Sequence, residues 1–329
     1  MSASIRPELA HVVVLAFQRR ADWLSSRVSD TISATEAAMA LGRSPYGTAW
    51  DLWERKRGGG APVSTDVTTR GHRWESAVLA EYGDESGGHV LTPAEACGAA
   101  RDSIVVLCHP QYPWLRQSPD AFAMTSRGFG QVEAKTAMRA GEWAPEPGVV
   151  IDQWDDAYAE LVPPHYAIQG YVQLAVTGLP WVDLCALVPT PTWLKLRWVR
   201  LQRDEGTQAA LIGELDQWRQ RHLVEGEPPP IDESDACNRH FSAAFPPRQH
   251  KPVRIATDEE AARMTELAEI RARQKADEKR AGQLRNELIA SAEGLRLRLD
   301  GTPRSPYGQP QKTTGEGSAF VLYRFLISR

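Results

Sequence analysis

The sequence predicts an α/β protein with a mixed central sheet flanked by helices and a C-terminal helical arm. Helix signals and short strand-like runs alternate through most of the chain. A helix that begins at Pro164 and ends at Gly178 precedes the apolar run Val182 to Val188, which is typical of a buried central strand. Asp258 to Leu299 is densely charged and carries apolar residues at helical spacing, which predicts the arm.

Composition narrows the class of protein. The 329 residues are 42% hydrophobic and 24% charged, as in ordinary soluble globular proteins, and the net charge is −4. A protein that coats nucleic acid is usually basic overall, so any surface facing DNA must be a local basic patch. The four cysteines form no CxxC pair, which disfavours disulfides and a zinc ribbon and favours a reducing cytosol.

The N-terminal region contains no membrane or export signal that we recognise. The apolar run His11 to Phe17 is too short to span a bilayer. It is followed by Gln18-Arg19-Arg20, whereas a signal peptide has small residues at its cleavage site. We therefore expect a cytoplasmic protein without a membrane partner.

The N-terminal third is predicted to be helical. Gly42 ends the first helix, Thr48 caps the second, and the run Gly58-Gly59-Gly60 forms a flexible loop before the third. The expected helices are Thr35 to Leu41, with Thr35 as the cap, then Ala49 to Lys56 and Arg70 to Tyr82.

The middle of the chain alternates strands and helices. Expected strands are Ile104 to Leu107, Asp120 to Met124, Gln131 to Lys135, Val182 to Val188 and Leu196 to Leu201. Expected helices are Pro164 to Thr177 and Thr207 to Leu223, and a loop rich in Pro, Trp and acidic residues spans Glu142 to Pro163. The predicted boundaries are a first domain at 1–235, a linker at 236–256, a charged helical or coiled-coil arm at 257–300 and a tail at 301–329. The arm is one long helix or a helical hairpin broken near Gly282, and the tail holds a terminal strand from Ala319 to Ile327.

Acidic and basic residues on two neighbouring strands carry the chemistry. Asp120 follows Ser118-Pro119 at the start of one strand, and Glu133 and Lys135 lie on the next. Because side chains alternate along a strand, Glu133 and Lys135 point to the same face, and a hairpin brings Asp120 close to them. Carboxylate oxygens suit Mg²⁺, and the Ala134 carbonyl adds a third oxygen. Such an ion polarises a phosphate and acidifies a water molecule, which Lys135 would orient.

Further polar residues extend this set. Gln169 and Gln173 are four residues apart on the following helix and therefore share one face, and Glu75 lies on the third helix. Taken singly, each has a plainer explanation. Glu133 and Lys135 also suit an exposed ion pair worth under ~1 kcal/mol, and the others suit solvated helix positions. The order of helix Glu, strand Asp, strand Glu-Ala-Lys and helix Gln-x-x-x-Gln favours the site.

In this order the motifs resemble the lambda-exonuclease and YqaJ-type viral recombinase family of PD-(D/E)XK nucleases. The similarity covers roughly residues 15 to 235, and its strength lies in the ordered set of motifs. The matching segments are Trp23-Leu24 with Arg27, Ile32 to Thr35, Leu41 to Tyr46, Gly71 to Glu75, Ser118 to Asp120, Glu133 to Lys135, Tyr166 to Gln169, Gln173 to Gly178 and Arg203 to Glu205.

The resemblance implies a restriction-endonuclease-like core at 1–235 and a metal-dependent exonuclease that degrades linear double-stranded DNA from 5′ to 3′. It implies one or two Mg²⁺ ions, or Mn²⁺ in their place, a ring-shaped homotrimer and a single-strand-annealing recombinase as partner. It also implies a phage- or prophage-encoded protein acting in the bacterial host cytoplasm.

The resemblance places a 5′-phosphate pocket at Arg27, Thr35 and Ser118. One guanidinium and two hydroxyls suit a terminal phosphate. This chain departs from the family pattern there, because Thr35 replaces the usual Ser and one extra residue separates it from Arg27. Arg27 is equally compatible with a surface position. Near the motifs, Arg19, Arg20, Arg43, Arg70 and Arg73 are candidates to line a DNA channel, of which we select Arg43, Arg70 and Arg73.

Two alternatives stay open. A RecB-like or Cas4-like nuclease of the same fold, or an endonuclease, would share the acidic site. Many Cas4-like enzymes hold an iron–sulfur cluster with three cysteines after the nuclease core, whereas only Cys185 and Cys237 follow Glu133 here, so no cluster is expected. A non-catalytic DNA-binding protein on the same fold is the other alternative, and the intact Asp120, Glu133 and Lys135 argue against it.

Overall fold

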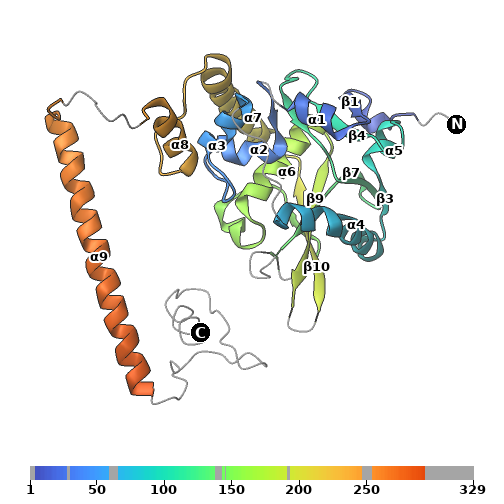
Figure 1. Ribbon diagram of the computed structural model, residues 1–329. Helices are drawn as coiled ribbons and strands as arrows, with labels where there is room; N and C mark the ends of the chain where they lie inside the picture. The colour runs from blue at the N-terminus through green and yellow to red at the C-terminus, as the bar shows by residue number, and fades with distance from the viewer. Residues whose placement is uncertain are drawn as a thin grey trace. The chain divides into compact units, whose positions relative to one another are not determined.

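The chain forms two compact units, residues 1–246 and 247–329, in this computed structural model (Figure 1). The structure describes residues 4–27, 30–58, 66–137, 143–144, 146–190, 193–246 and 254–292, and the side chains of 66–72, 156 and 292 lie outside this description. The two units are described separately below.

The first unit begins with a small four-stranded sheet in the order β1-β4-β5-β2. The strand that opens it was not predicted: Val13 to Phe17 pairs antiparallel with Ile104 to Cys108 and so satisfies its backbone groups there. The elements are η1 (Pro7–Leu9), β1 (Val13–Phe17), α1 (Arg20–Ser26), β2 (Ile32–Ser33), β4 (Ile104–Cys108) and β5 (Leu115–Gln117).

The second sheet has six strands in the order β3-β6-β7-β9-β10-β8. It is mixed, since β7 runs parallel to β9 and β10 parallel to β8, while the other neighbours are antiparallel. This confirms the α/β class with a mixed sheet. Its strands are β3 (His89–Leu91), β6 (Ala121–Thr125), β7 (Gly128–Thr136), β8 (Val149–Ile151), β9 (Trp181–Pro189) and β10 (Leu194–Gln202).

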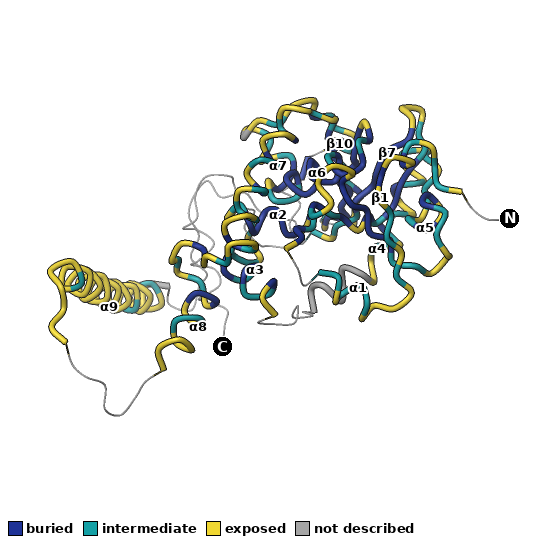
Figure 2. The backbone as a smooth tube through the Cα atoms, turned by 90° about the horizontal axis from the view of Figure 1, so that it is seen from above, coloured by how far each residue is buried: buried dark blue, intermediate teal, exposed yellow. Residues whose placement is uncertain are grey.

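Two helices cover the two faces of this sheet. On one face, α4 (Asp66–Ser86) packs Val78 and Tyr82 against Val132 and Cys185. On the other, α6 (Pro164–Thr177) is buried against the large core, and β9 is buried along almost its whole length. Figure 2 shows the buried segments gathered around α6, β7 and β10. The apolar run predicted as a central strand is thus β9, at the middle of the sheet.

A glycine lets α6 approach the sheet closely. A Cβ atom on Gly170 would lie 2.8 Å from Leu201 and 3.2 Å from Val182, closer than ordinary van der Waals contact. Gly170 is fourth in a run of buried residues that includes Gln169 and Gln173. The close approach therefore places both amide side chains next to β7.

Two helices of the N-terminal region each bury one charged side chain, Glu36 in the first and Lys56 in the second. The capping box of α2 (Ala34–Ala40) is formed by Ser33 and Glu36, so the helix begins one residue earlier than predicted and Thr35 is not its cap. Thr48 caps α3 (Ala49–Lys56) as predicted. A short helix α5 (Pro93–Cys97), capped by Thr92, follows β3.

The predicted linker and loop contain further structure. Residues of the 236–256 linker belong to α8 (Asp235–Ala244), in which Ala236 and Cys237 pack against Trp50 and Trp53. The linker prediction is wrong for this helix, since those apolar contacts bury it on the first unit. The Glu142 to Pro163 loop holds β8 and η3 (Asp156–Glu160). The predicted helix at Thr207 to Leu223 is α7 (Glu205–Arg219) followed by the π-helical turn η4 (Gln220–Val224).

In the second unit, α9 (Asp258–Ala292) is one helix that continues through Gly282, so the alternative of a broken hairpin is wrong. Nearly all of its described residues are exposed (Figure 2). This confirms a C-terminal helical arm, while the predicted strand at 319–327 lies outside the described residues. Among the described helices, none is both long and apolar enough to cross a membrane.

Candidate active site

Asp120 and Glu133 face each other across the β6–β7 hairpin. Ala121 pairs with Val132 in antiparallel register, so Asp120, one residue earlier, lies opposite Glu133. The Asp120 carboxylate also accepts a hydrogen bond from the backbone N–H of Ala134, at 2.9 Å. The structure thus brings together two carboxylates that the sequence separates by thirteen positions.

Lys135 completes the strand part of the cluster. Its Nζ lies 2.5 Å from Glu133 Oε1, and the same ammonium lies 5.1 Å from the ring centroid of Tyr166. Burial alone would lower the pKa of Lys135, but Glu133 and then Asp120 outweigh it and raise that pKa above its usual value. Lys135 is therefore a firmly charged cation beside two acids.

Both predicted glutamines reach Glu133. Gln169 Nε2 donates to Oε1 at 2.5 Å, and Gln173 Nε2 donates to Oε2 at 2.6 Å. Each oxygen of Glu133 thus receives an amide, and Oε1 receives Lys135 as well. The Oε1 atom of Gln173 is buried and has no hydrogen-bond partner in the structure. The α6 face fixes the orientation of the Glu133 carboxylate.

The charged form of Asp120 is disfavoured in this arrangement. Burial, followed by the neighbouring Glu133 carboxylate, raises the pKa of Asp120 well above its usual value, although Lys135 acts in the opposite direction. Glu75 on α4 also raises the pKa of Asp120, which places it within electrostatic reach of the pair. The cluster has more negative than positive charge, and a divalent cation would relieve that imbalance.

The possible ligand atoms of this cluster are oxygens, which favour a hard cation. Two carboxylates with a strand carbonyl and water are the ligand type that Mg²⁺ takes in nucleotide-processing sites. In the described part of the chain, no three or more His, Cys, Asp and Glu side chains gather closely enough to hold an ion by themselves. The residues present therefore fit a cation that shares its ligands with water and substrate.

The three predicted 5′-phosphate residues are placed differently. Thr35 and Ser118 are exposed, and each lies two residues beyond the parallel β2–β5 pair Ser33↔Arg116. Arg27 instead donates to Ser33 Oγ and to Glu36, both at 3.3 Å. The contact with Ser33 was not predicted.

Glu36 gathers cations next to this segment. Lys56 Nζ lies 2.9 Å from Glu36, with Arg27 at 3.3 Å and Arg55 at 4.0 Å. Although burial acts against it, the charges of Lys56 and Arg27 lower the pKa of Glu36 to about 2. One carboxylate against three cations leaves this corner of the unit positively charged.

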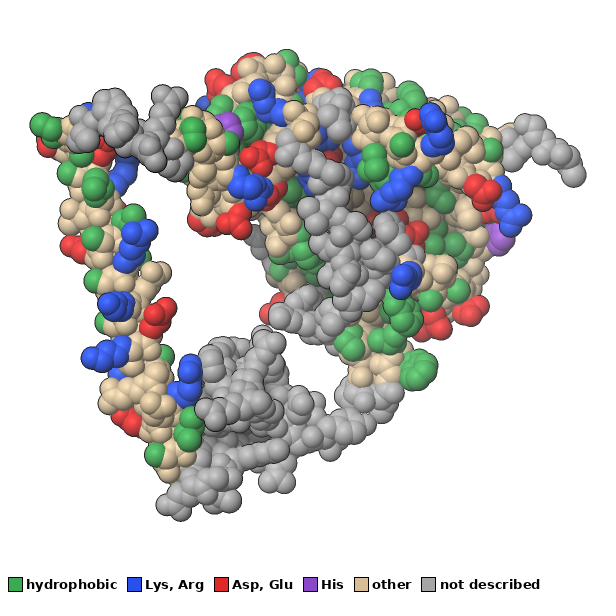
Figure 3. All heavy atoms as spheres, viewed as in Figure 1, with side chains coloured by type: hydrophobic (Ala, Val, Ile, Leu, Met, Phe, Trp, Pro, Cys, Tyr) green, Lys and Arg blue, Asp and Glu red, His purple; other side chains and the backbone are tan. Residues whose placement is uncertain are grey.

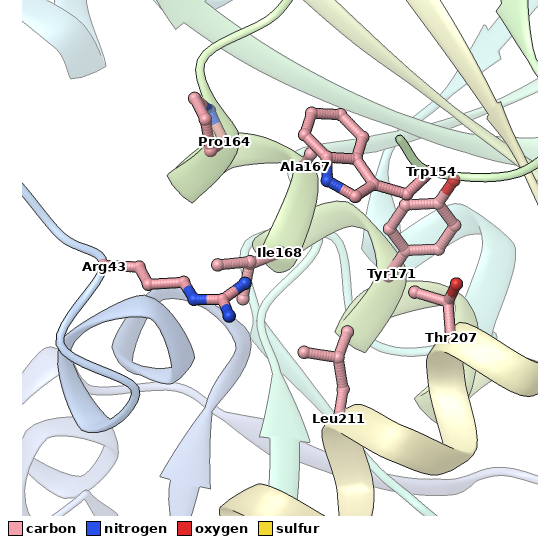
Figure 4. A pocket seen from close by; sticks show the side chains of 8 residues that line it. All are labelled: Arg43, Trp154, Pro164, Ala167, Ile168, Tyr171, Thr207 and Leu211. Carbon is pink, nitrogen blue, oxygen red and sulfur yellow. The ribbon is translucent and has the colours of Figure 1, made fainter. Parts of the chain in front are cut away.

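The other predicted arginines are Arg43, Arg70 and Arg73. Arg43 lines a cavity of about 340 Å³ beside α6 and α7 (Figure 4). Ala167, Ile168 and Tyr171 line the same cavity, and they face away from the side of α6 that carries Gln169 and Gln173. Arg73 is exposed on α4, two residues before Glu75, and the side chain of Arg70 lies outside the described residues.

His165 and Tyr46 join the site without having been predicted. His165 precedes Gln169 by four residues, so the helical spacing that selected the two glutamines also selects it. Burial, followed by Lys135, lowers the pKa of His165 to about 4, and its ring packs edge-on against Tyr46. The Tyr46 hydroxyl lies 3.2 Å from that of Tyr166. No local sequence signal pairs Tyr46 with α6, 120 residues away.

The mixed sheet, the carboxylate pair and the adjacent lysine define a PD-(D/E)XK-type nuclease, an enzyme that hydrolyses DNA phosphodiester bonds. Residues 22–180 match the YqaJ-like viral recombinase domain. This part of the chain thus carries a YqaJ-like domain, which confirms the resemblance seen in the sequence.

Comparisons with solved structures give distant similarities. An alkaline exonuclease from Laribacter hongkongensis is 18% identical with a TM-score of 0.43, and the match covers 68% of this chain and 98% of that one. A phage-related exonuclease from Haemophilus somnus is 12% identical with a TM-score of 0.40, covering 59% and 94%. The shutoff and exonuclease protein of Kaposi's sarcoma-associated herpesvirus is 9% identical with a TM-score of 0.33, covering 60% and 68%. No curated protein matches the chain.

Proposed function

We propose that the protein is a Mg²⁺-dependent exonuclease that degrades linear double-stranded DNA from 5′ to 3′ in phage-type homologous recombination. The observation that carries the proposal is the pair of half-buried Asp120 and buried Glu133, with Lys135 and two amides fixed around it. The family match supports the DNA substrate. The strand polarity and the annealing partner come from the family resemblance.

Each residue of the cluster has a role in this proposal. Asp120, Glu133 and the Ala134 carbonyl would hold the cation. Once bound there, Mg²⁺ supplies Lewis-acid polarisation of the phosphate and a water of lowered pKa. Lys135 orients the attacking water or neutralises the phosphate. Gln169 and Gln173 keep the Glu133 oxygens in place, and the unpartnered Gln173 Oε1 is available to accept a hydrogen bond from water.

The DNA end would be held beside this cluster. Arg27, Thr35 and Ser118 form the proposed 5′-phosphate pocket, supported by the excess of cations around Glu36. Ser33, which Arg27 contacts, joins that pocket. Arg43, Arg70 and Arg73 are proposed to contact the DNA backbone, and Glu75 to assist the acidic pair. The protein would act as a homotrimer in the host cytoplasm with a single-strand-annealing recombinase.

A time course on end-labelled linear and circular duplex, in Mg²⁺ and in EDTA, tests the activity. We expect degradation of linear DNA only, in Mg²⁺ only, with mononucleotides released from the 5′ end. Cleavage of the circle would identify an endonuclease. Absence of cleavage on every substrate would leave the non-catalytic alternative.

The terminal phosphate gives a separate test. A 5′-phosphorylated end should be degraded faster than a 5′-hydroxyl end, and Arg27→Ala should remove the difference. Equal rates on the two ends in the unaltered protein would contradict the pocket while leaving the nuclease assignment standing.

A further inference from the structure

The β9–β10 hairpin carries one aromatic and two basic residues outside the acidic cluster. These residues, Trp193, Lys195 and Arg197, are called the stripe below. Trp193 at its turn is 79% exposed, Lys195 is exposed and Arg197 is half-buried. Figure 1 shows the hairpin projecting beyond the rest of its sheet, and hydrophobic side chains are visible there in Figure 3. A large exposed Trp on a projecting turn is costly to leave in water and is typical of a recognition surface.

Hydrogen bonds to Thr190 hold the backbone of Trp193 at the start of β10. The backbone N–H of Thr190 donates to the Trp193 carbonyl at 2.7 Å, and the Thr190 hydroxyl donates to the same oxygen at 2.6 Å. In return the Trp193 N–H donates to the Thr190 hydroxyl at 3.1 Å. These bonds extend the strand ladder past Pro189↔Leu194, so the alternation of β10 continues to Trp193.

The stripe lies on the same face of the sheet as the acidic cluster. Along β10, Leu196 and Trp198 pack on the α4 face, whereas Val199 and Leu201 pack in the core beneath α6. By the two-residue alternation of a strand, Arg197, Lys195 and Trp193 belong to the α6 face. Glu133 and Lys135 are on that face too, since Gln169 and Gln173 of α6 bind Glu133.

The strand register fixes the separation. Arg197 pairs with Ala186, and Ala186 pairs with Lys135, so the three lie in one row across the sheet. Two strand spacings separate Arg197 from Lys135 by about 10 Å, and each two-residue step toward the tip adds about 7 Å. The stripe therefore starts beside the cluster and leads away from it.

The two cations are available for a ligand. In the described part of the chain, Lys195 and Arg197 have no ion pair with an acidic side chain. Their neighbour Arg200, on the opposite face, is held by Asp183 through two bonds of 2.7 Å. The same strand thus carries one neutralised arginine and two unpaired cations.

We propose that Trp193, Lys195 and Arg197 form a track for a single DNA strand entering or leaving the active site. Phosphates bind Lys195 and Arg197, and a base stacks on Trp193, which is how single strands are bound without sequence preference. This rests on the proposed function, because it takes DNA as the substrate. The stripe is continuous with the cluster and complementary in charge to a nucleic acid backbone.

The test is the affinity of a fluorescent oligo(dT) of about 12 nucleotides, followed by anisotropy in EDTA to prevent cleavage. Trp193→Ala should weaken binding roughly tenfold, since one stacked base contributes about 5- to 150-fold. Trp193→Phe should retain most of the affinity. The double variant Lys195→Ala/Arg197→Ala should reduce the slope of log Kd against log salt by about 1.4, because each single-strand phosphate contributes about 0.7.

Two matched controls separate this effect from general changes of the surface. Ile231, 78% exposed, matches the exposure of Trp193, and Arg221, whose side chain is 67% exposed, matches the loss of a cation. Ile231→Ala and Arg221→Ala should bind the oligonucleotide as the unaltered protein does. A strand carrying 5-iodouracil should also crosslink to Trp193.

Other results would overturn the track. Binding within twofold of the unaltered protein in both track variants is one, and equal losses for a blunt duplex of the same length is another. If Trp193→Ala loses affinity only together with oligomer mass in light scattering, the tip is an interface between copies. A protein that binds the single strand through the track but never cleaves DNA would contradict the proposed function and keep the track.

Discussion

Each face of the six-stranded sheet carries carboxylate side chains, but different neighbouring groups compensate their negative charge on the two faces. On the α4 face, Asp183 is fully buried and receives both bonds of Arg200 and a third from the Tyr82 hydroxyl at 2.5 Å. Arg200 also stacks 3.8 Å above the Trp181 ring. On the α6 face, Asp120 and Glu133 share Lys135 and two neutral amides.

The difference distinguishes a structural ion pair from the proposed metal site. Asp183 has its countercharge inside the fold, with every acceptor oxygen occupied. Burial raises the pKa of both acids, but Arg200 opposes this rise at Asp183, whereas the neighbouring Glu133 carboxylate adds to it at Asp120. A fold that keeps two like charges side by side loses stability unless a ligand compensates them, so the imbalance supports the proposed active site on the α6 face.

The largest expected effect comes from removing one acid of the unbalanced pair. Asp120→Asn should lower the rate of DNA degradation by on the order of 10³-fold, because the cation loses a ligand. Its free energy of unfolding should stay level or rise, since the repulsion with Glu133 disappears. End-labelled duplex degradation and urea unfolding measure the two quantities. A clear loss of stability without a loss of rate would show that Asp120 is structural.

Breaking the Asp183–Arg200 ion pair should lower the stability of the fold and leave the rate of DNA degradation unchanged. Asp183→Ala leaves Arg200 buried without its partner, and we expect a loss of about 3–5 kcal/mol in unfolding free energy. The rate per folded molecule should stay close to that of the unaltered protein. Replacing both charges, as Asp183→Leu with Arg200→Leu, should recover much of the stability. A double variant as unstable as the single one would contradict this account.

An intermediate effect is expected at the amides on Glu133. Gln173→Ala should weaken the response to Mg²⁺ by roughly 10- to 100-fold, as substitutions that free a ligating carboxylate usually do. The Mg²⁺ concentration for half-maximal rate is the measurement. Gln208→Ala on α7 is the matched control, since it removes a buried amide other than the two that donate to Glu133. Similar shifts in both variants would point to a packing effect.

The smallest effect is expected from one hydroxyl. Tyr82→Phe removes the bond to Asp183 but keeps the ring packed near Trp198, and should cost about 1–2 kcal/mol of unfolding free energy. Because Arg200 still neutralises Asp183, the rate should be unchanged. Thermal unfolding and the degradation assay check both. A rate loss would show that this cluster positions Glu75, seven residues earlier on the same face of α4.

Local patterns were enough for several elements. The helix from Pro164 to Thr177 and the helix from Ala49 to Lys56 have the predicted bounds, because Pro, Gly and Thr act within one turn. The predictions failed where distant partners decide. The strand at Val13 depends on pairing with Cys108, and the helix at 235–244 on contacts with Trp50 and Trp53. No local residue encodes those partners.

The sequence by itself determined which residues could form the acidic cluster and the helix face that meets it, since strand alternation and helical spacing are local rules. Only the tertiary structure decided that Asp120 lies opposite Glu133, that Arg27 binds Ser33 and Glu36, and that the row from Lys135 continues to Arg197. Register between strands and packing between helices set those distances, and both depend on residues far apart along the chain.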